Sequence, residues 1–292
     1  AGLQLRCYIN LPAVRSNRGD DVEPLLAMIK EGLQLARRSA ARTTTAWLAD
    51  NYAGMALSNG RADEALEHAN EAVELGRIVG DPHMGLRLRT RAGILALRGD
   101  LEAARRDVEA ARAYPDETEP QIAESSPLTD GYVTWLDDPA GALALLRDWA
   151  ESHPELLGTP SHLARIMARM ALRLDDRAAL ERAVELYRQS SEGRSGRVYE
   201  AKRRWVDALT AGDPSEAEAA AGVLEDAGYR AEALDALADA ALLAARAGVD
   251  SPALERAQAL STAMGIGHTL GRLPETRWLE RSRADKPAAP RV

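Results

Sequence analysis

The sequence has 292 residues, 28% of them charged, and a formal net charge of −8. Alanine (56) and leucine (39) supply about a third of the chain, phenylalanine is absent and aromatic residues stop at 4%. This composition excludes global disorder and an all-β sandwich, and the acidic balance argues against nucleic-acid binding. The single cysteine, Cys7, excludes an internal disulfide framework, and we expect it to be a buried, inert thiol.

The amino-terminal residues carry no targeting signal. The chain starts at Ala1 without a methionine, a basic n-region or an apolar h-region, so we expect no signal peptide and a cytoplasmic location. Helical spacing is already under way at Leu3, which is typical of a segment from a longer protein. No run approaches 18 uninterrupted apolar residues, so we expect no membrane contact.

Turn signals divide the rest of the chain at intervals of 36 to 41 residues. They are Gly19, Gly60, Gly99, Asp138, Asp176, Gly212 and Gly248. Between them apolar residues keep helical spacing, which predicts two helices per interval. The predicted pairs are 3–18/21–40, 44–59/61–79, 83–98/100–113, 119–136/139–152, 161–174/177–190, 197–211/214–227 and 229–247/252–264.

Capping residues support this division. Asp81, Asp138, Asp213 and Ser251 each precede a proline, an arrangement that starts a helix. Glycines occur where helices should end. Each pair is apolar on more than one face and needs a neighbour to cover it. We therefore predict an all-α fold, an α-solenoid of about seven stacked antiparallel helix pairs over residues 1–265. Residues 266–292 are predicted to form a carboxyl-terminal extension with a disordered end.

The second pair resembles a tetratricopeptide repeat. Residues 47–75 read WLADNYAGMALSNGRADEALEHANEAVEL, with Ala53, Ala65 and Ala72 at the small positions where helices of that family approach closely. The third pair matches with Ala92, Ala104 and Ala111. The period exceeds the usual 34 residues, and the proline that normally ends each repeat is missing after Leu75.

The long, alanine- and arginine-rich repeats are also similar to the helical region of large bacterial signal-transduction ATPases. These include regulators of the maltose-activator type with a LuxR-like end and ATPase modules linked to nucleotide cyclases. Residues 224–246 (LEDAGYRAEALDALADAALLAAR) carry this similarity most clearly. It implies a sensor or scaffold arm whose ATPase and output domains lie outside this chain.

No pattern in the sequence is arranged for catalysis. The glycines between Gly54 and Gly60 lack the spacing and the lysine of a phosphate loop, and Gly265-Ile-Gly267 follows a helix rather than a strand. The five histidines are scattered, without metal-ligand spacing. Paired carboxylates such as Asp175-Asp176 stand at the repeat turns, where helix capping explains them better than general acid catalysis. We expect no enzyme activity, no cofactor and no metal site.

Basic residues gather on three of the predicted first helices. Against eleven cations in the third, fifth and sixth pairs stand only Glu200 and Asp207. First helices line the concave side of such solenoids, so this pattern indicates a basic groove for an anionic partner. A solvated face with salt bridges between repeats is the alternative. The cations are Arg87, Arg89, Arg91, Arg98, Arg165, Arg169, Arg173, Arg197, Lys202, Arg203 and Arg204.

Two polar residues match half of the tetratricopeptide clamp that grips a peptide carboxylate. Asn51 and Arg89 fall at matching positions, but Ile9 and Ala13 replace the lysine and asparagine of the first pair. A chaperone-tail adaptor is therefore disfavoured. Our predicted partner-binding residues are Asn51, Arg89, Arg165, Arg169, Arg173 and Lys202.

The leading hypothesis is a non-enzymatic binding and sensor module, the repeat arm of a bacterial transcriptional or signalling regulator. It would bind a protein, a peptide or a small anionic effector in its concave groove. The alternative is a structural scaffold or adaptor that self-associates through an end repeat as a homo-oligomer. Direct nucleic-acid binding is not expected.

Overall fold

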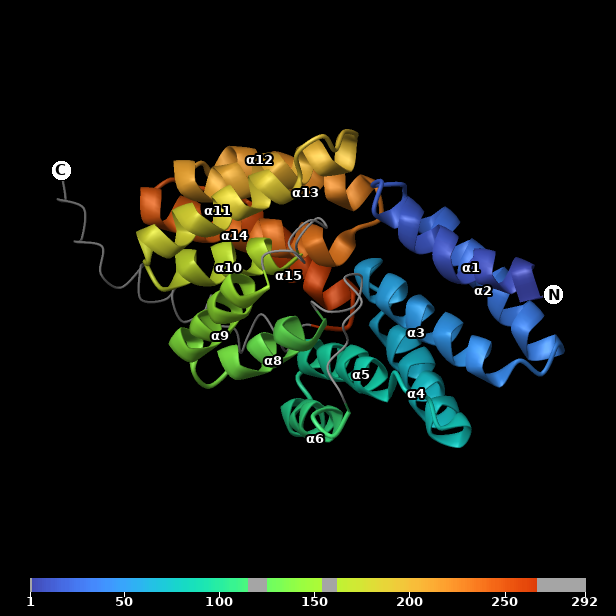
Figure 1. The fold of residues 1–292 in the computed structure, drawn as a ribbon. Helices are drawn as coiled ribbons and strands as arrows, with labels where there is room; N and C mark the ends of the chain where they lie inside the picture. Colours follow the sequence, from blue (N-terminus) through green and yellow to red (C-terminus); the bar gives the residue numbers. More distant parts are fainter. Residues whose placement is uncertain (1, 115–124, 154–161, 267–292) are drawn as a thin grey trace, which may run out of the picture.

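The computed structural model describes residues 2–114, 125–153 and 162–266, and these contain helices and turns without a strand. The helices follow one another as antiparallel pairs that stack in chain order, as Figure 1 shows. The predicted all-α solenoid is confirmed, and each described helix falls within three residues of its expected bounds. Residues 119–124, where the helix α8 was expected to begin, lie outside the described residues. The pairs are α1 (Gly2–Ser16) with α2 (Val22–Arg38), α3 (Arg42–Ser58) with α4 (Ala62–Val79), α5 (Met84–Arg98) with α6 (Leu101–Ala111), α8 (Ser125–Trp135) with α9 (Pro139–Ser152), α10 (His162–Arg173) with α11 (Arg177–Ser190), α12 (Arg197–Ala211) with α13 (Pro214–Asp226), and α14 (Arg230–Ala247) with α15 (Ala253–Ala263).

Local capping chemistry sets many of the helix boundaries. The side chains of Asp138, Asp176 and Asp213 accept hydrogen bonds from backbone N–H groups in the first turns of α9, α11 and α13. These bonds satisfy donors that have no partner inside the helix. Gly80 ends α4 and Gly248 ends α14, each in the left-handed conformation. The capping interpretation of the turn carboxylates is correct at these positions.

Small residues form the contacts between helices. Ala65 and Ala72 of α4 are fully buried against the partner helix, and Ala104 and Ala111 repeat the arrangement in α6. An alanine lets two helix backbones approach closely, so a larger side chain there would push the helices apart. The alanine register predicted from the sequence is therefore the packing register of the solenoid.

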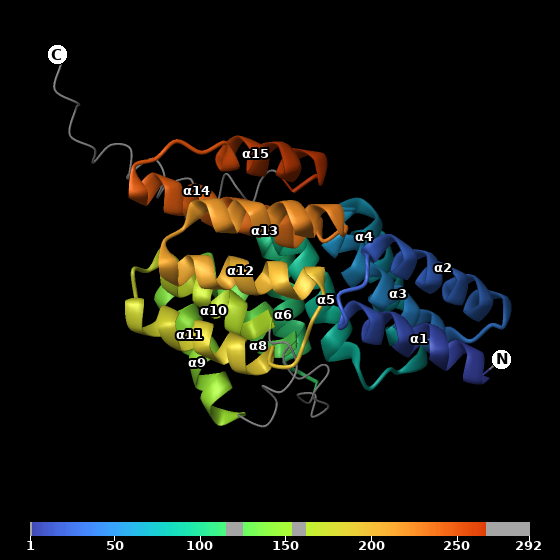
Figure 2. The same ribbon diagram turned by 90° about the horizontal axis from the view of Figure 1, so that it is seen from above.

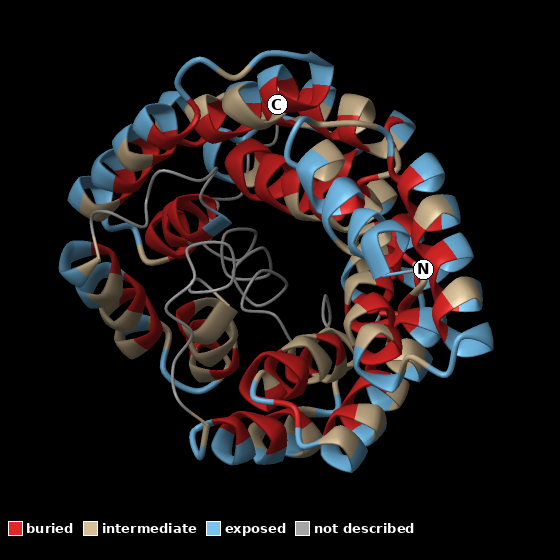
Figure 3. Ribbon diagram, turned by 45° about the vertical axis from the view of Figure 1, so that its right-hand side comes forward, coloured by how far each residue is buried: buried red, intermediate tan, exposed pale blue. Residues whose placement is uncertain are grey.

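The first helices of the pairs form the inner layer of the superhelix. Each contacts the first helix of the next pair, through α1, α3, α5, α8, α10, α12 and α14 in turn. The second helices lie outside this row, and Figure 3 shows their exposed outer faces. α10 and α14 are buried along almost their whole length. Most side chains of α10 and α14 therefore meet other parts of the protein rather than solvent.

The superhelix closes on itself. α14 contacts α3, so the row of first helices forms a ring, and Figures 1 and 2 show the blue amino-terminal pair beside the orange helices of the sixth and seventh pairs. Backbone atoms bond across this junction, which we call the seam. The Val22 N–H donates to the Ala227 oxygen at 3.0 Å, and Asn59 Nδ2 donates to the Gly228 oxygen at 3.1 Å. Tyr229 Oη donates to the Asp20 oxygen at 2.9 Å.

The expectation that Cys7 is buried is wrong: Cys7 is exposed, on a face of α1 that the other described helices leave uncovered. Residues 267–292, most of the predicted carboxyl-terminal extension, lie outside the described residues. Within the described ranges, no helix combines the length and the apolar character that crossing a membrane requires.

Candidate functional site

The predicted basic stripe lies on α10, and a matching acidic stripe lies on α14. Arg165, Arg169 and Arg173 are spaced by four residues, which places them on one face of their helix. Three carboxylates on α14 meet them from across α12. The ion pairs are Arg165–Glu232 at 3.0 Å, Arg169–Asp235 at 2.9 Å, Arg169–Asp239 at 3.0 Å and Arg173–Asp239 at 2.7 Å.

Helix α12 contributes two side chains to these ion pairs, the buried indole of Trp205 and the cation Lys202. The Trp205 side chain is fully buried, and its indole N–H donates to Asp239 Oδ2 at 2.9 Å. The Arg165 guanidinium lies 5.0 Å from the centre of the same ring, which adds a cation–π contact. Lys202 Nζ lies 2.9 Å from Glu232 Oε1. We call the residues of this connected set on α10, α12 and α14 the inner charge network.

The network holds its carboxylates ionised. Burial alone would raise the pKa of Glu232, but Lys202 and Arg165 beside it lower the pKa to about 2. Burial opposes the charge of Asp239 in the same way, and Arg169 and Arg173 together lower its pKa below the ordinary value. In the low-dielectric interior, opposite charges at hydrogen-bond distance strongly favour the ionised forms. Glu232 and Asp239 are therefore ionised at neutral pH.

The expectation that these cations line an exposed basic groove is wrong. Arg89, Arg165, Arg169 and Arg173 are each between 2% and 8% exposed. A charge is buried only when it is paired, and α14 supplies the pairing carboxylates for the three arginines of α10. The inner row of helices is not uniformly basic, because α14 is also a first helix and carries Glu232, Asp235 and Asp239. The salt bridges between repeats are present, but the face that carries them is not solvated.

The two clamp residues lie on other inner helices. Asn51 of α3 uses Nδ2 to donate to the Ile9 oxygen at 3.1 Å, so this side chain joins the first and second pairs within the chain. Arg89 of α5 is buried, and its Nη1 lies 3.1 Å from the position that a Cβ on Gly85 would take. The structure thus unites four of the six predicted residues in the inner charge network and leaves Asn51 and Arg89 on α3 and α5.

The acidic partners of these arginines were not predicted from the sequence. Glu232, Asp235 and Asp239 are spaced by three and four residues, so the helical period alone places them on one face of α14. A comparison of this stripe with that of α10 would have indicated complementary faces. The curvature of the superhelix decides which distant helices meet, and a local sequence pattern does not predict this curvature.

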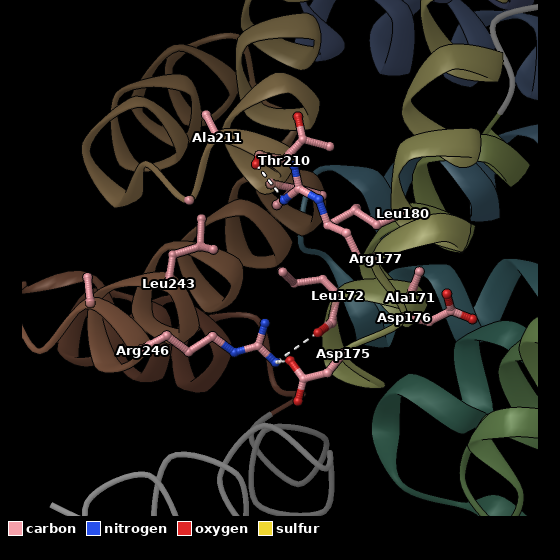
Figure 4. Close-up of a pocket in the computed structure, with 13 residues that line it drawn as sticks. Ala171, Leu172, Asp175, Asp176, Arg177, Leu180, Thr210, Ala211, Leu243 and Arg246 are labelled. Carbon is pink, nitrogen blue, oxygen red and sulfur yellow. Dashed lines mark hydrogen bonds and ion pairs between the residues drawn. The ribbon is translucent and has the colours of Figure 1, made fainter.

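A hollow lies at the edge of the superhelix, where α10, α12 and α14 end (Figure 4). Its volume is about 450 Å³, within the range of small-molecule sites. Arg177 donates to the Thr210 oxygen at 2.8 Å and Arg246 to the Leu172 oxygen at 2.8 Å. Arg246 also pairs with Asp175 at 2.6 Å. Both guanidinium groups are thus engaged at helix carboxyl ends, where they satisfy carbonyl groups.

A smaller notch opens on the inner helices α8, α10 and α14. Its volume is about 30 Å³, and its lining mixes apolar and charged side chains, among them Tyr132, Ile166, Met170 and Asp235. Ile166 is only half-buried, whereas every other residue of α10 from Leu163 to Arg173 is buried. A space of this size accepts the tip of one side chain. We call it the inner notch.

Comparison with known proteins bears on the fold. No family model matches the chain, and no curated protein matches it. Among solved structures, a Rap protein crystallised in complex with Competence and Sporulation Factor is similar. The match covers 96% of this chain and 77% of the Rap protein, with a TM-score of 0.69 and 14% sequence identity.

The chain is a tetratricopeptide-like superhelix similar to that of a Rap protein. At 14% identity the likeness concerns the fold. In the described residues, no group of three or more histidine, cysteine or carboxylate side chains is placed to hold a metal ion. The side chains that the fold does bring together, in the inner charge network, bond mainly to one another.

Proposed function

We propose that this chain is a non-enzymatic binding and sensor module that receives a peptide or protein segment on its inner face. The observation that carries the proposal is the inner notch, a partly apolar space that the described residues leave open between the inner helices α8, α10 and α14. Ile166 and Tyr132 offer apolar contact there, and Asp235 lies at the rim. Apolar anchors with a few polar groups are what peptide-binding grooves use.

The fold supports the same proposal. A Rap protein with this superhelix was crystallised with a bound factor, so the architecture can receive a partner. We further propose that the chain serves as the repeat arm of a bacterial transcriptional or signalling regulator. The alanine- and arginine-rich repeats support that assignment, and a phosphate loop or helix-turn-helix elsewhere in the same gene product would test it.

The test uses a random peptide library presented to the purified chain. We expect a family of related peptides to be enriched, and their affinity to fall at least about tenfold in the Ile166→Glu variant. Ile78→Glu is the matched control, because Ile78 is 58% exposed on the outer helix α4. Failure to enrich any peptide, or equal affinity in the two variants, would contradict the proposal.

A second candidate function rests on α1. Leu3, Leu11 and Val14 are 80%, 44% and 53% exposed along this end helix. An uncovered apolar face suits a scaffold that self-associates through its end repeat. Sedimentation of the wild type and of Leu11→Glu would test it, with a dimer expected only for the wild type. A wild-type monomer at all concentrations would remove this candidate.

A further inference from the structure

A polar cavity lies at the seam where the superhelix closes. Its volume is about 100 Å³, and residues from both ends of the chain bound it. Ser16, Asn17 and Ser58 come from the first two pairs, and the other lining residues come from α10, α11, α12 and the start of α14. We call this space the seam cavity. It differs from both the edge hollow and the inner notch.

Every residue that lines the seam cavity has a polar side chain. Empty cavities in proteins are apolar, whereas polar cavities hold water or a ligand. One water takes about 30 Å³ in the liquid, so the space equals roughly three waters. A single carboxylate or phosphate group fits this space, and a whole peptide does not.

The charges around the cavity favour an anion. Two cationic side chains, Arg165 and Lys202, face one carboxylate, Glu232. The local charge is therefore +1. His162 adds no charge, because Arg165 Nη2 lies 3.0 Å from His162 Nδ1 and a guanidinium can only donate. The imidazole must therefore accept that bond through an unprotonated nitrogen. Two cations that share one buried carboxylate attract a second negative group.

Some hydrogen-bonding groups of the lining are not used within the described chain. Arg165 Nη1, Glu232 Oε2 and the Tyr187 hydroxyl have no hydrogen-bond partner there. Arg165 is 4% exposed and Tyr187 2%, so bulk water does not solvate them. An unsatisfied buried polar group costs about 1–3 kcal/mol, and a polar occupant of the cavity would offset that cost.

We propose that the seam cavity binds a small oxyanion, with a carboxylate or a phosphate as the charged group, and that this binding holds the superhelix closed. Arg165, Lys202 and Tyr187 supply donors, and Ser16 and Asn17 bring the first pair to the same space. A ligand that touches both ends of the chain binds the closed form more tightly than an opened form. This inference does not rest on peptide recognition at the inner notch.

The first experiment compares sodium phosphate, sodium acetate and sodium chloride at equal ionic strength, by calorimetric titration and melting temperature. We expect saturable binding and a higher melting temperature with one of the oxyanions over chloride. A preference for acetate would identify a carboxylate ligand, and a preference for phosphate a phosphoryl ligand. Equal effects of all three salts would overturn the proposal.

Charge variants test where the anion binds. We expect Lys202→Gln to weaken oxyanion binding about tenfold or more and Glu232→Gln to strengthen it several-fold, because the local balance changes in opposite directions. Lys30→Gln, on the exposed face of α2, is the control and should leave affinity unchanged. Tyr187→Phe removes only a hydroxyl and should lower affinity even if Lys202→Gln does not fold. Affinities unchanged in Tyr187→Phe and Glu232→Gln would overturn the assignment.

Hydrogen exchange at the Val22 amide measures how often the superhelix opens at the seam. Its N–H bonds to the Ala227 oxygen across the seam, so it exchanges with solvent when the ends separate. The oxyanion should slow this exchange and leave the Ala142 amide, which bonds within its own helix turn, unchanged. Unaltered Val22 exchange at saturating anion would overturn the link to closure. If the anion binds but no peptide is enriched, only the proposal of peptide binding is contradicted. If peptides are enriched but no anion binds, only the seam-cavity proposal is contradicted.

Discussion

At the scale of single residues, Asp50 is a buried carboxylate whose environment disfavours its ionised form. It is 6% exposed on α3, and Oδ1 has no hydrogen-bond partner in the described chain. Burial raises its pKa to about 6, against the opposing effects of Arg87 and a hydrogen bond from Thr90. The nearby Arg87 is already engaged in a fully buried ion pair with Asp81. Asp50 is thus a group that the fold prefers to keep protonated.

This preference predicts a pH-dependent effect of Asp50→Asn. Because the pKa of Asp50 in the folded protein lies above its ordinary value of 3.8, protonated Asp50 contributes stability that is present below about pH 4 and lost as the pH rises through 6. Asparagine cannot ionise. We expect Asp50→Asn to gain stability relative to the wild type between pH 4 and pH 7.5, by on the order of 2–3 kcal/mol.

Urea unfolding at a series of pH values measures this difference. Asp63→Asn is the control, since the Asp63 side chain is 90% exposed. If the stability difference between Asp50→Asn and the wild type stays constant from pH 4 to pH 7.5, folding does not raise the pKa of Asp50.

At the scale of helices, alanine contacts and buried ion pairs set the spacing. Ala65 of α4 has no exposed surface, so Ala65→Leu would overpack the α3–α4 contact. We expect a loss of about 1–3 kcal/mol. Ala110→Leu is the control on the exposed face of α6, and we expect it to change stability by only a few tenths of a kcal/mol. Equal melting temperatures for the two variants would show that the alanine does not govern the spacing.

The inner charge network predicts a much larger effect for one carboxylate than for a surface pair. Asp239→Ala leaves Arg169, Arg173 and the Trp205 indole without their shared acceptor, and should cost about 3–5 kcal/mol. Asp207→Ala breaks only the half-exposed pair with Arg188 and should cost about 0–1 kcal/mol. Chemical denaturation of both variants gives the comparison. Similar losses would mean that the buried pairs are no stronger than exposed ones.

At the scale of the whole molecule, the seam makes this solenoid differ from an open array. In an open array each repeat contacts only its neighbours, and stability is a sum of local terms. Here α3 contacts α14, and hydrogen bonds to the backbone oxygens of Ala227 and Gly228 link residues about 170 to 205 positions apart. We therefore expect the first and last pairs to unfold together, because separating either end breaks the same contacts.

Two glycines test this coupling. Gly228 has φ +84°, and a Cβ there would lie 3.1 Å from both Val22 Cβ and Asn59 Nδ2 across the seam. Gly212 has φ +69° with no neighbouring atom within 4 Å. Gly212→Ala should cost only the backbone strain, about 1–2 kcal/mol. Gly228→Ala should cost more and should speed amide exchange at Val22, which hydrogen exchange measures directly. Equal costs and unchanged Val22 exchange would show that the seam does not couple the ends.

Local sequence patterns determined the helices and their pairing. Capping aspartates such as Asp138 and Asp213, helix-ending glycines and the 3.6-residue period act within a few residues, so the chain itself displays them. The alanines at the helix contacts were equally readable, because close approach needs a small side chain wherever two paired helices meet. The similarity to tetratricopeptide repeats followed from these features.

Only the tertiary structure decided what the charges do. The period placed Arg165, Arg169 and Arg173 on one face, but the curvature of the superhelix decided that this face meets α14 across Trp205 instead of solvent. The seam cavity was equally hidden, since Asn17 and Lys202 become neighbours only after the whole superhelix has closed. Local free energies fix each helix pair, whereas the small rotation from pair to pair, summed along the chain, decides which distant faces meet.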